Sequence, residues 1–428
     1  MTKNHKISES PAAAPTPRYM ESRLTAQVAH TQVIAPVPEF PGARITEGRV
    51  KALDGVRGLA IAMVMIGHIG EFGTDISPIF RAVYALSWIG VELFFALSGF
   101  LITSILLETL NTKTYLARFY LRRFWRIVPL YYVVLTVTTF VLPQIFTELI
   151  TPEMAATWRD HAPWYYGFLA NFMMLRLNDM PKDPVTVAWS LAIEEQFYLV
   201  WPLVVMSFRR WRPLGVLGSL IALSIGLKAV LLMRGWNEFH FYLFTPTRLE
   251  PLVIGSALAL ARHHGYLRSF GTAGDHVWPL AKWPFARLGC IAAVVLLFLH
   301  LLSLLSYGVA GVGVVATVIE SLTYYLLIGI MFTSLLGYVL AKPDSDVARL
   351  FQKKWLCQLG LWSYSIYLTH NLINHGLAQS GLTFGILGTN VVGLIGHGLV
   401  TVTLSVGVGC VLYVYVERPI ISWRNRCI

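Results

Sequence analysis

Cysteine is scarce in this sequence. Its 428 residues include four cysteines, and no two of them form a CxxC pair. The spacing therefore does not indicate a metal-ligand set or a disulfide framework. Three of the four lie in or beside apolar segments, so we predict buried free thiols and no metal site. The four are Cys290, Cys357, Cys410 and Cys427.

Charged residues are also few. They make up 13% of the chain, and hydrophobic residues make up 55%, with a mean hydropathy of +0.59. A soluble domain is about 25% charged, and it does not contain repeated apolar runs of about 18 residues. We therefore exclude a large soluble protein and predict an all-α polytopic membrane protein.

Acidic residues are fewer than basic ones, which gives a net charge of +11. In a membrane protein this excess does not indicate nucleic acid, because Lys and Arg gather on cytoplasmic loops and bind anionic headgroups. We expect membrane lipids and an anionic substrate as partners, and no nucleic acid.

Residues 1–48 contain no apolar run and are rich in Pro, Ala, Ser and Thr. This composition predicts a disordered cytoplasmic tail. The tail lacks the apolar core of a signal peptide, so the first apolar segment is expected to act as an uncleaved anchor.

Residues 49–420 are expected to form the transmembrane domain, and residues 421–428 a short cytoplasmic C-terminal tail. About ten segments are long enough to cross a bilayer. They are 52–71, 82–108, 127–146, 190–208, 214–233, 249–262, 289–306, 311–340, 355–378 and 391–416.

The distribution of Lys and Arg gives an orientation. With the N-terminus inside, the inner connections hold 19 of these residues and the outer ones six. Positive charge on short connections marks the cytoplasmic side, so we predict that both termini are cytoplasmic.

The first apolar segment contains Arg57 and His68. Eleven helical steps of about 100° bring the two side chains within roughly 20° of one face, about 16 Å apart along the axis. Ionisable groups at membrane depth are costly unless they face a cavity or a partner. For His68 alone, a structural hydrogen bond is the simpler explanation, and its companions favour a catalytic base.

Glu194 and Glu195 open the fourth segment at a similar predicted depth to His68. They are either an interfacial pair in water or include a carboxylate that orients and charges the imidazole, and we favour the second. Four arginines precede or begin the third segment, and such guanidinium groups suit phosphate. Positive-inside charge is the alternative for these residues, which are Arg118, Arg122, Arg123 and Arg126.

Other polar residues interrupt apolar segments. Ser98 and Gly99 indicate either close helix packing or room for an acyl chain, and Glu92 is a pore-facing candidate. Tyr364, Tyr367 and His370 form a stripe that suits either interhelical hydrogen bonds or substrate contact. The aromatics of the long outer connection form an interfacial belt or stack on a sugar; they are Trp158, Trp164, Tyr165 and Tyr166.

Together these motifs resemble the acyltransferase-3 family of membrane acyltransferases over roughly residues 50–420. Arg57 and His68 look like its R-x10-H motif, and Arg123 and Arg126 look like its RxxR. The other matching motifs are FFxxSG at Phe94–Gly99, SLAIEEQFYLVWP at 190–202, SYSIYLTH at 363–370 and VERP at 416–419.

The resemblance implies ten spans and transfer of an acyl group, usually acetyl, from cytoplasmic acyl-CoA. The acceptor would be a carbohydrate or lipid-linked glycan, and the location the cytoplasmic membrane of a bacterium. Acyl-CoA would be a substrate, with no permanently bound cofactor. Some members carry a C-terminal SGNH esterase-like domain, and we expect no such domain here after residue 416.

We expect the four arginines to hold the CoA phosphates and Arg57 to steer the donor. His68 would take the proton of the acceptor hydroxyl or carry the acyl group itself, and Glu194 or Glu195 would stabilise the imidazolium. Two alternatives stay open: an acyltransferase for a small molecule such as a macrolide, and a polytopic transporter without chemistry.

Overall fold

The computed structural model describes residues 50–69, 87–264, 285–305, 312–383 and 391–427. The chain divides into two compact units, Met1–Ala43 and Arg44–Ile428, and only the second contains described residues. The predicted disordered tail therefore lies outside the described residues.

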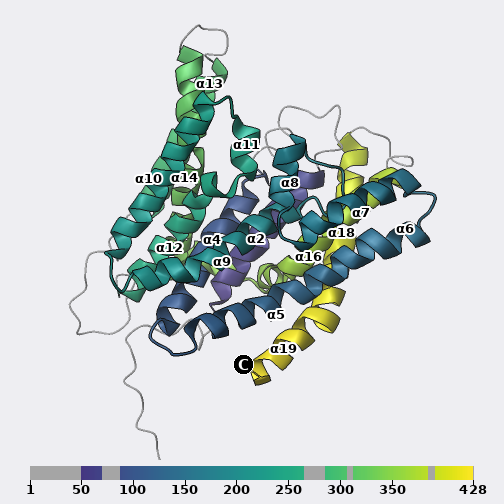
Figure 1. The fold of residues 1–428 in the computed structure, drawn as a ribbon, viewed down its shortest axis with the longest axis horizontal. Coiled ribbons are helices and arrows are strands. Elements are labelled where there is room, and N and C mark those ends of the chain that lie inside the picture. The colour runs from purple at the N-terminus through teal and green to yellow at the C-terminus, as the bar shows by residue number, and fades with distance from the viewer. Residues whose placement is uncertain (1–49, 70–86, 265–284, 306–311, 384–390, 428) are drawn as a thin grey trace, which may run out of the picture. The chain divides into compact units, whose positions relative to one another are not determined.

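The described residues form helices and no strands (Figure 1). The helices in the first half of the described chain are α2 (Lys51–Ile69), α4 (Gly90–Thr109), α5 (Tyr115–Thr136), the π-helix η2 (Val137–Val141), α6 (Leu142–Ile145), α7 (Pro152–Tyr166) and α8 (Ala170–Leu177). The remainder are α9 (Ala188–Ser207), α10 (Pro213–Met233), α11 (Glu238–Leu243), the 3-10 helix η3 (Thr245–Thr247), α12 (Leu249–His263), α13 (Phe285–Leu305), α14 (Val312–Ala341), α15 (Asp346–Phe351), α16 (Lys354–Gln379), α18 (Val391–Leu412), the π-helix η5 (Tyr413–Glu417) and α19 (Arg418–Cys427).

Seven of the described helical stretches are long and apolar enough to cross a membrane. Each of the ten predicted segments overlaps at least one described helix, and segment 127–146 covers the end of α5 with η2 and α6. Helices α9, α12 and α16 are not among the seven. Helix α12 has 15 residues, or about 22 Å of helix, which is shorter than a bilayer core of about 30 Å. The polar residues of α9 and α16 lower the mean hydropathy of those helices.

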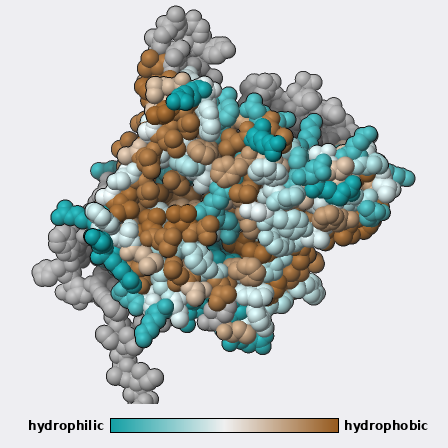
Figure 2. Space-filling model, viewed as in Figure 1, coloured by the Kyte–Doolittle hydropathy of each residue, from teal (hydrophilic) through white to brown (hydrophobic). Residues whose placement is uncertain are grey.

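Part of the surface of the helical bundle is apolar. Figure 2 shows hydrophobic residues gathered over the region of α10, α12 and α14. On α10, Leu214 is 70% exposed and Met233 is 79% exposed. Such contiguous apolar exposure is typical of a surface that faces lipid. Cys290 and Cys427 are also exposed, so the prediction of buried thiols is wrong for these two.

Two close helix crossings build the core around the site, and each depends on a glycine. A Cβ at Gly360 of α16 would lie 1.8 Å from the backbone oxygen of Asp54 in α2. A Cβ at Gly99 of α4 would lie 1.9 Å from the oxygen of Leu252 in α12. Only glycine permits this approach, so Gly99 serves close helix packing, one of its two predicted roles.

Candidate active site

A cavity of about 110 Å³ lies among α2, α4, α5, α9, α16 and η5. One water needs a cavity volume of roughly 10–15 Å³, so this central cavity has room for several waters or a small acyl group. Its wall is formed by Arg57, Val91, Phe94, Phe95, Ser98, Leu101, Ile102, Arg123, Arg126, Ile127, Ser190, Leu191, Glu194, Tyr198, Gly360, Leu361, Ser363, Tyr364, Tyr367 and Glu417.

Three guanidinium groups line the central cavity: Arg57 from α2, and Arg123 and Arg126 from α5. The i, i+3 spacing places the α5 pair on one helix face. Arg118 is exposed and Arg122 is half-buried, and neither is on the wall. Of the four arginines predicted to bind phosphate, only the RxxR pair Arg123 and Arg126 therefore lines the cavity.

Acidic and hydroxyl groups form another part of the wall. Ser98 donates a hydrogen bond to Glu194 Oε1 at 2.7 Å. The Tyr198 hydroxyl donates to Ser98 Oγ at 2.9 Å and to Glu194 Oε2 at 3.2 Å. Tyr198 also lies under the Arg123 guanidinium, 5.2 Å from its ring centroid. Glu194 is thereby held by hydroxyl groups and faces the cavity, and Glu195 is not on the wall.

His68 lies in the last turn of α2. Its Nδ1 is 2.8 Å from the backbone oxygen of Val64, so this nitrogen carries the proton and donates it. The neutral ring then has an unprotonated Nε2, which is the form that a general base requires. The Trp88 ring lies beside it, with ring centroids 5.2 Å apart.

His370 of α16 stands edge-on to His68, with ring centroids 4.9 Å apart. Its Nδ1 donates to the Tyr367 oxygen at 2.9 Å, and its Nε2 is 3.4 Å from His68 Nδ1. Among the described residues, neither Glu194 nor Glu195 forms a hydrogen bond or ion pair with His68. The predicted carboxylate–imidazole pair is corrected to a pair of histidines, because α16 lies between α9 and the end of α2.

Tyr367 lies between the central cavity and the two histidines. It is part of the cavity wall, and its ring centroid is 5.7 Å from that of His370. Its hydroxyl donates to the Val187 oxygen at 2.7 Å and is 2.5 Å from Ser190 Oγ. Tyr364, also on the wall, donates to the Ile127 oxygen at 2.7 Å. Both tyrosines thus make interhelical hydrogen bonds and face the cavity.

Glu92 does not face the central cavity. Its Oε1 is 2.6 Å from Arg248 Nη2, and the Arg248 side chain is fully buried. The guanidinium also lies over the Tyr325 ring, 4.2 Å from its centroid. The prediction of a pore-facing carboxylate is therefore corrected, because Glu92 is not on the cavity wall and pairs with a buried arginine.

The aromatics of the outer connection pack inward. The Tyr165 hydroxyl donates to Asp183 Oδ2 at 2.9 Å, and His161 Nδ1 is 2.7 Å from the same oxygen. Burial raises the pKa of Asp183, and the hydrogen bond and charge of His161 oppose that rise. Trp158 is also buried, in a small cluster with Ile150. These side chains brace α7, and only Trp164 and Tyr166 keep partial exposure.

Several site residues were missed by reading the sequence alone. Glu417, in the π-helix η5, is on the cavity wall and accepts a hydrogen bond from Ser365 at 2.9 Å. Glu417 belongs to the VERP motif, and Tyr198 follows Glu194 by one helical turn, so both carried a signal. Asn374 lies among the polar residues His370, Asn371 and His375, and His397 is a single polar residue in an apolar segment.

Comparison with known proteins identifies the family. The acyltransferase-3 family, described as an acyltransferase domain, matches residues 50–414. The chain belongs to this family. No solved structure matches the chain.

Two similar relatives of the family are named O-acetyltransferases. The peptidoglycan O-acetyltransferase OatA of Listeria monocytogenes is 29% identical over 353 residues, which are 76% of this chain and 50% of that protein. The O-acetyltransferase OatA of Staphylococcus aureus is 29% identical over 339 residues, 74% of this chain and 49% of that protein. The chain thus spans about half the length of the curated relatives it matches.

Proposed function

We propose that this chain is an integral membrane O-acetyltransferase. It moves an acetyl group from cytoplasmic acetyl-CoA to a hydroxyl group of a cell-wall carbohydrate. The observation that carries the proposal is the arginine-lined cavity close to a histidine whose Nε2 is unprotonated. Family membership supports acyl transfer, and the names of the relatives support acetyl as the group and a glycan as the acceptor.

The donor binds from the side of the arginines. Arg57, Arg123 and Arg126 supply positive charge to the cavity, and Arg424 of α19 extends this charge by donating to the backbone oxygen of Arg122 at 3.1 Å. Guanidinium groups bind phosphate oxygens in pairs, so this cluster suits the phosphates of CoA. The acetyl thioester then enters the central cavity.

Proton transfer takes place at His68. Its Nε2 takes the proton of the acceptor hydroxyl while the hydroxyl oxygen attacks the thioester carbonyl carbon. The carbon–sulfur bond breaks, the CoA thiolate leaves, and the imidazolium proton returns to the sulfur. His370 holds the edge of the His68 ring, and Trp88 offers an aromatic face for a sugar ring. The thioester reaches His68 past Tyr367, which separates the cavity from the two histidines.

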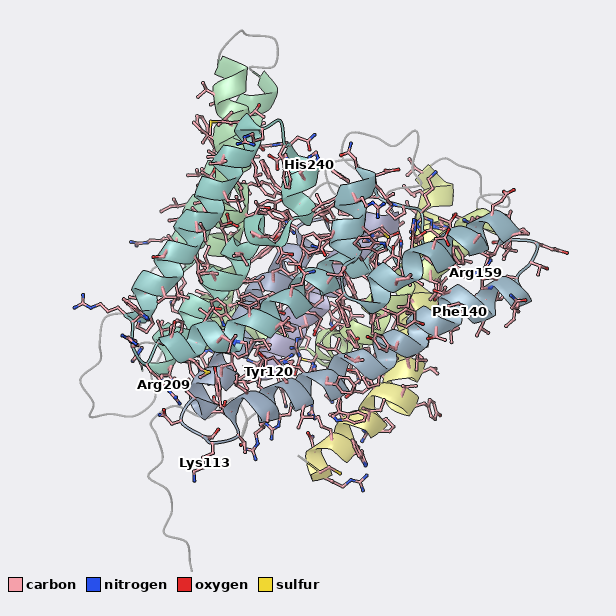
Figure 3. The ribbon with its side chains drawn as sticks, viewed as in Figure 1. Lys113, Tyr120, Phe140, Arg159, Arg209 and His240 are labelled. Atoms are coloured by element: carbon pink, nitrogen blue, oxygen red, sulfur yellow. The ribbon has the colours of Figure 1, made fainter. Side chains whose placement is uncertain are left out.

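The proposed topology has ten spans in the cytoplasmic membrane of a bacterium, with both termini inside. Two connections predicted to be cytoplasmic meet, since Arg209 Nη2 donates to the Leu110 oxygen. Figure 3 shows Lys113 and Arg209 near one end of α10 and His240 toward its other end, which suits opposite sides of a bilayer. Cys357 also contacts the Lys51 oxygen, so α16 and α2 begin on one side.

The test uses the purified full chain in lipid nanodiscs with radiolabelled acetyl-CoA and peptidoglycan fragments. Wild type is expected to release CoA and label the glycan, and His68→Ala to lose about 10²–10⁴-fold in rate. His300→Ala is the matched control, because His300 is 57% exposed and pairs with Glu320 away from the site. Equal rates for the His68 variant and wild type would remove His68 from the chemistry. Binding of acetyl-CoA without glycan labelling would point to a different acceptor, and no binding would favour a transporter.

A further inference from the structure

The last turn of α2 is held by a buried series of hydrogen bonds through Asn374, His397 and Thr383, the strut. No part of the proposed reaction uses these residues. Asn374 Nδ2 of α16 donates to the backbone oxygen of His68 at 2.9 Å. That oxygen is in the last turn of a helix, where carbonyl groups lack partners within the helix. Asn374 thus caps the residue that carries the proposed base.

Asn374 is itself fixed by a third helix. His397 Nε2 of α18 is 2.9 Å from Asn374 Oδ1, and the Thr383 hydroxyl is 2.8 Å from His397 Nδ1. Thr401 Oγ1 lies 3.5 Å from the same Nε2. Asn374 and His397 are both 0% exposed.

The hydrogen bonds assign one direction to the whole strut. Because the Asn374 amide nitrogen donates to His68, its oxygen accepts from His397 Nε2–H. His397 Nδ1 is then unprotonated and accepts from Thr383. A side chain that cannot donate to Asn374 Oδ1, or cannot donate to the His68 oxygen, therefore breaks this connection.

We infer that Asn374 and His397 are positioning residues that hold the last turn of α2 and thereby aim the His68 imidazole. The inference rests on the proposed function of His68 as the base. A base displaced by about 1 Å loses roughly 10²-fold in rate, so holding this turn matters more for the chemical step than for donor binding. The donor cavity lies elsewhere, since neither residue is on its wall.

The experiment compares Asn374→Leu with Asn371→Leu in the full chain. Asn371 is the matched control: it lies on α16, is 3% exposed, and its Oδ1 has no hydrogen-bond partner in the described part of the chain. Two quantities are measured: steady-state kcat and KM for acetyl-CoA, and the rate at which diethylpyrocarbonate modifies His68, read by peptide mass mapping. Asn374→Leu is expected to lower kcat about 10- to 100-fold with little change in KM. Its His68 modification rate should rise about fivefold or more, as expected when a buried hydrogen bond is lost.

A second pair guards against misfolding. His397→Gln keeps an N–H donor for Asn374 Oδ1 and should retain most of kcat, while His397→Leu should resemble Asn374→Leu. The inference is overturned if Asn374→Leu and Asn371→Leu give the same kcat and the same His68 modification rate, or if His397→Gln and His397→Leu behave alike. The modification rate needs no turnover, so it decides about the strut even if wild type transfers no acetyl group.

Discussion

Replacing Gly360 by Ala should destabilise the protein at the crossing of α2 and α16. The added Cβ would lie 1.8 Å from the Asp54 oxygen and 2.9 Å from the Gly58 nitrogen, both backbone atoms that cannot rotate away. The two helices must therefore separate by more than 1 Å to restore an ordinary contact of about 3.5 Å. Overpacking of this kind costs about 1–3 kcal/mol or more, and it also widens the central cavity, because Gly360 is on its wall.

The same helix offers the control. Gly376→Ala adds a Cβ that meets nothing within 4 Å, and the exchange should stabilise α16 by roughly 0.5–1 kcal/mol through helix propensity. Thermal unfolding in detergent, followed by tryptophan fluorescence and by the monodisperse fraction on size exclusion, compares both variants with wild type. Gly360→Ala should lower the transition temperature and Gly376→Ala should hold or raise it. Equal transition temperatures for the two variants would refute the close crossing.

Two further predictions concern charge. The double variant Arg123→Ala/Arg126→Ala should weaken acetyl-CoA binding by at least about tenfold, because both guanidinium groups line the cavity. The control Arg118→Ala removes an exposed charge and should change the affinity by less than about threefold. Isothermal titration measures both affinities, and a larger effect of Arg118→Ala would move the donor site outward. Glu92→Ala should lower the free energy of unfolding by about 3–5 kcal/mol, because it leaves the fully buried Arg248 unpaired. Adding Arg248→Met should recover much of that stability. A double variant that unfolds at the same temperature as Glu92→Ala would contradict a buried ion pair.

The sequence predicted where helices lie along the chain, but not which helices pack against one another. Apolar length alone located each of the ten segments on a helix, because backbone hydrogen bonds at membrane depth must be satisfied within the segment. Helical periodicity also predicted that Arg57 and His68 share a face of α2. It could not predict that the two would meet different helices, with Arg57 at the cavity and His68 beside His370.

The predicted depth of a residue in the membrane did not indicate which side chain it contacts. Glu194 and His68 were paired because both lie toward the predicted outer side, but a helix at the right depth presents only one face to a given neighbour. Which face it presents is fixed by the crossing geometry, and glycines such as Gly360 set that geometry. The glycine was visible in the sequence, and the helix it approaches was not.

Two polar networks differ in burial: one joins Ser98, Tyr198 and Glu194, and the other joins Asn374 and His397 to the His68 backbone. Ser98, Tyr198 and Glu194 end at a cavity with room for several waters, so a hydroxyl there can exchange its partner for a ligand or a solvent molecule. Asn374 and His397 are fully buried between helices, so every lost hydrogen bond there leaves an unsatisfied group. The first network suits a site that must rearrange as the donor enters and leaves. The second suits a part that must stay fixed, and that part ends on the backbone of His68. Rearrangement at the donor and rigidity at the base are the combination that directed proton transfer needs.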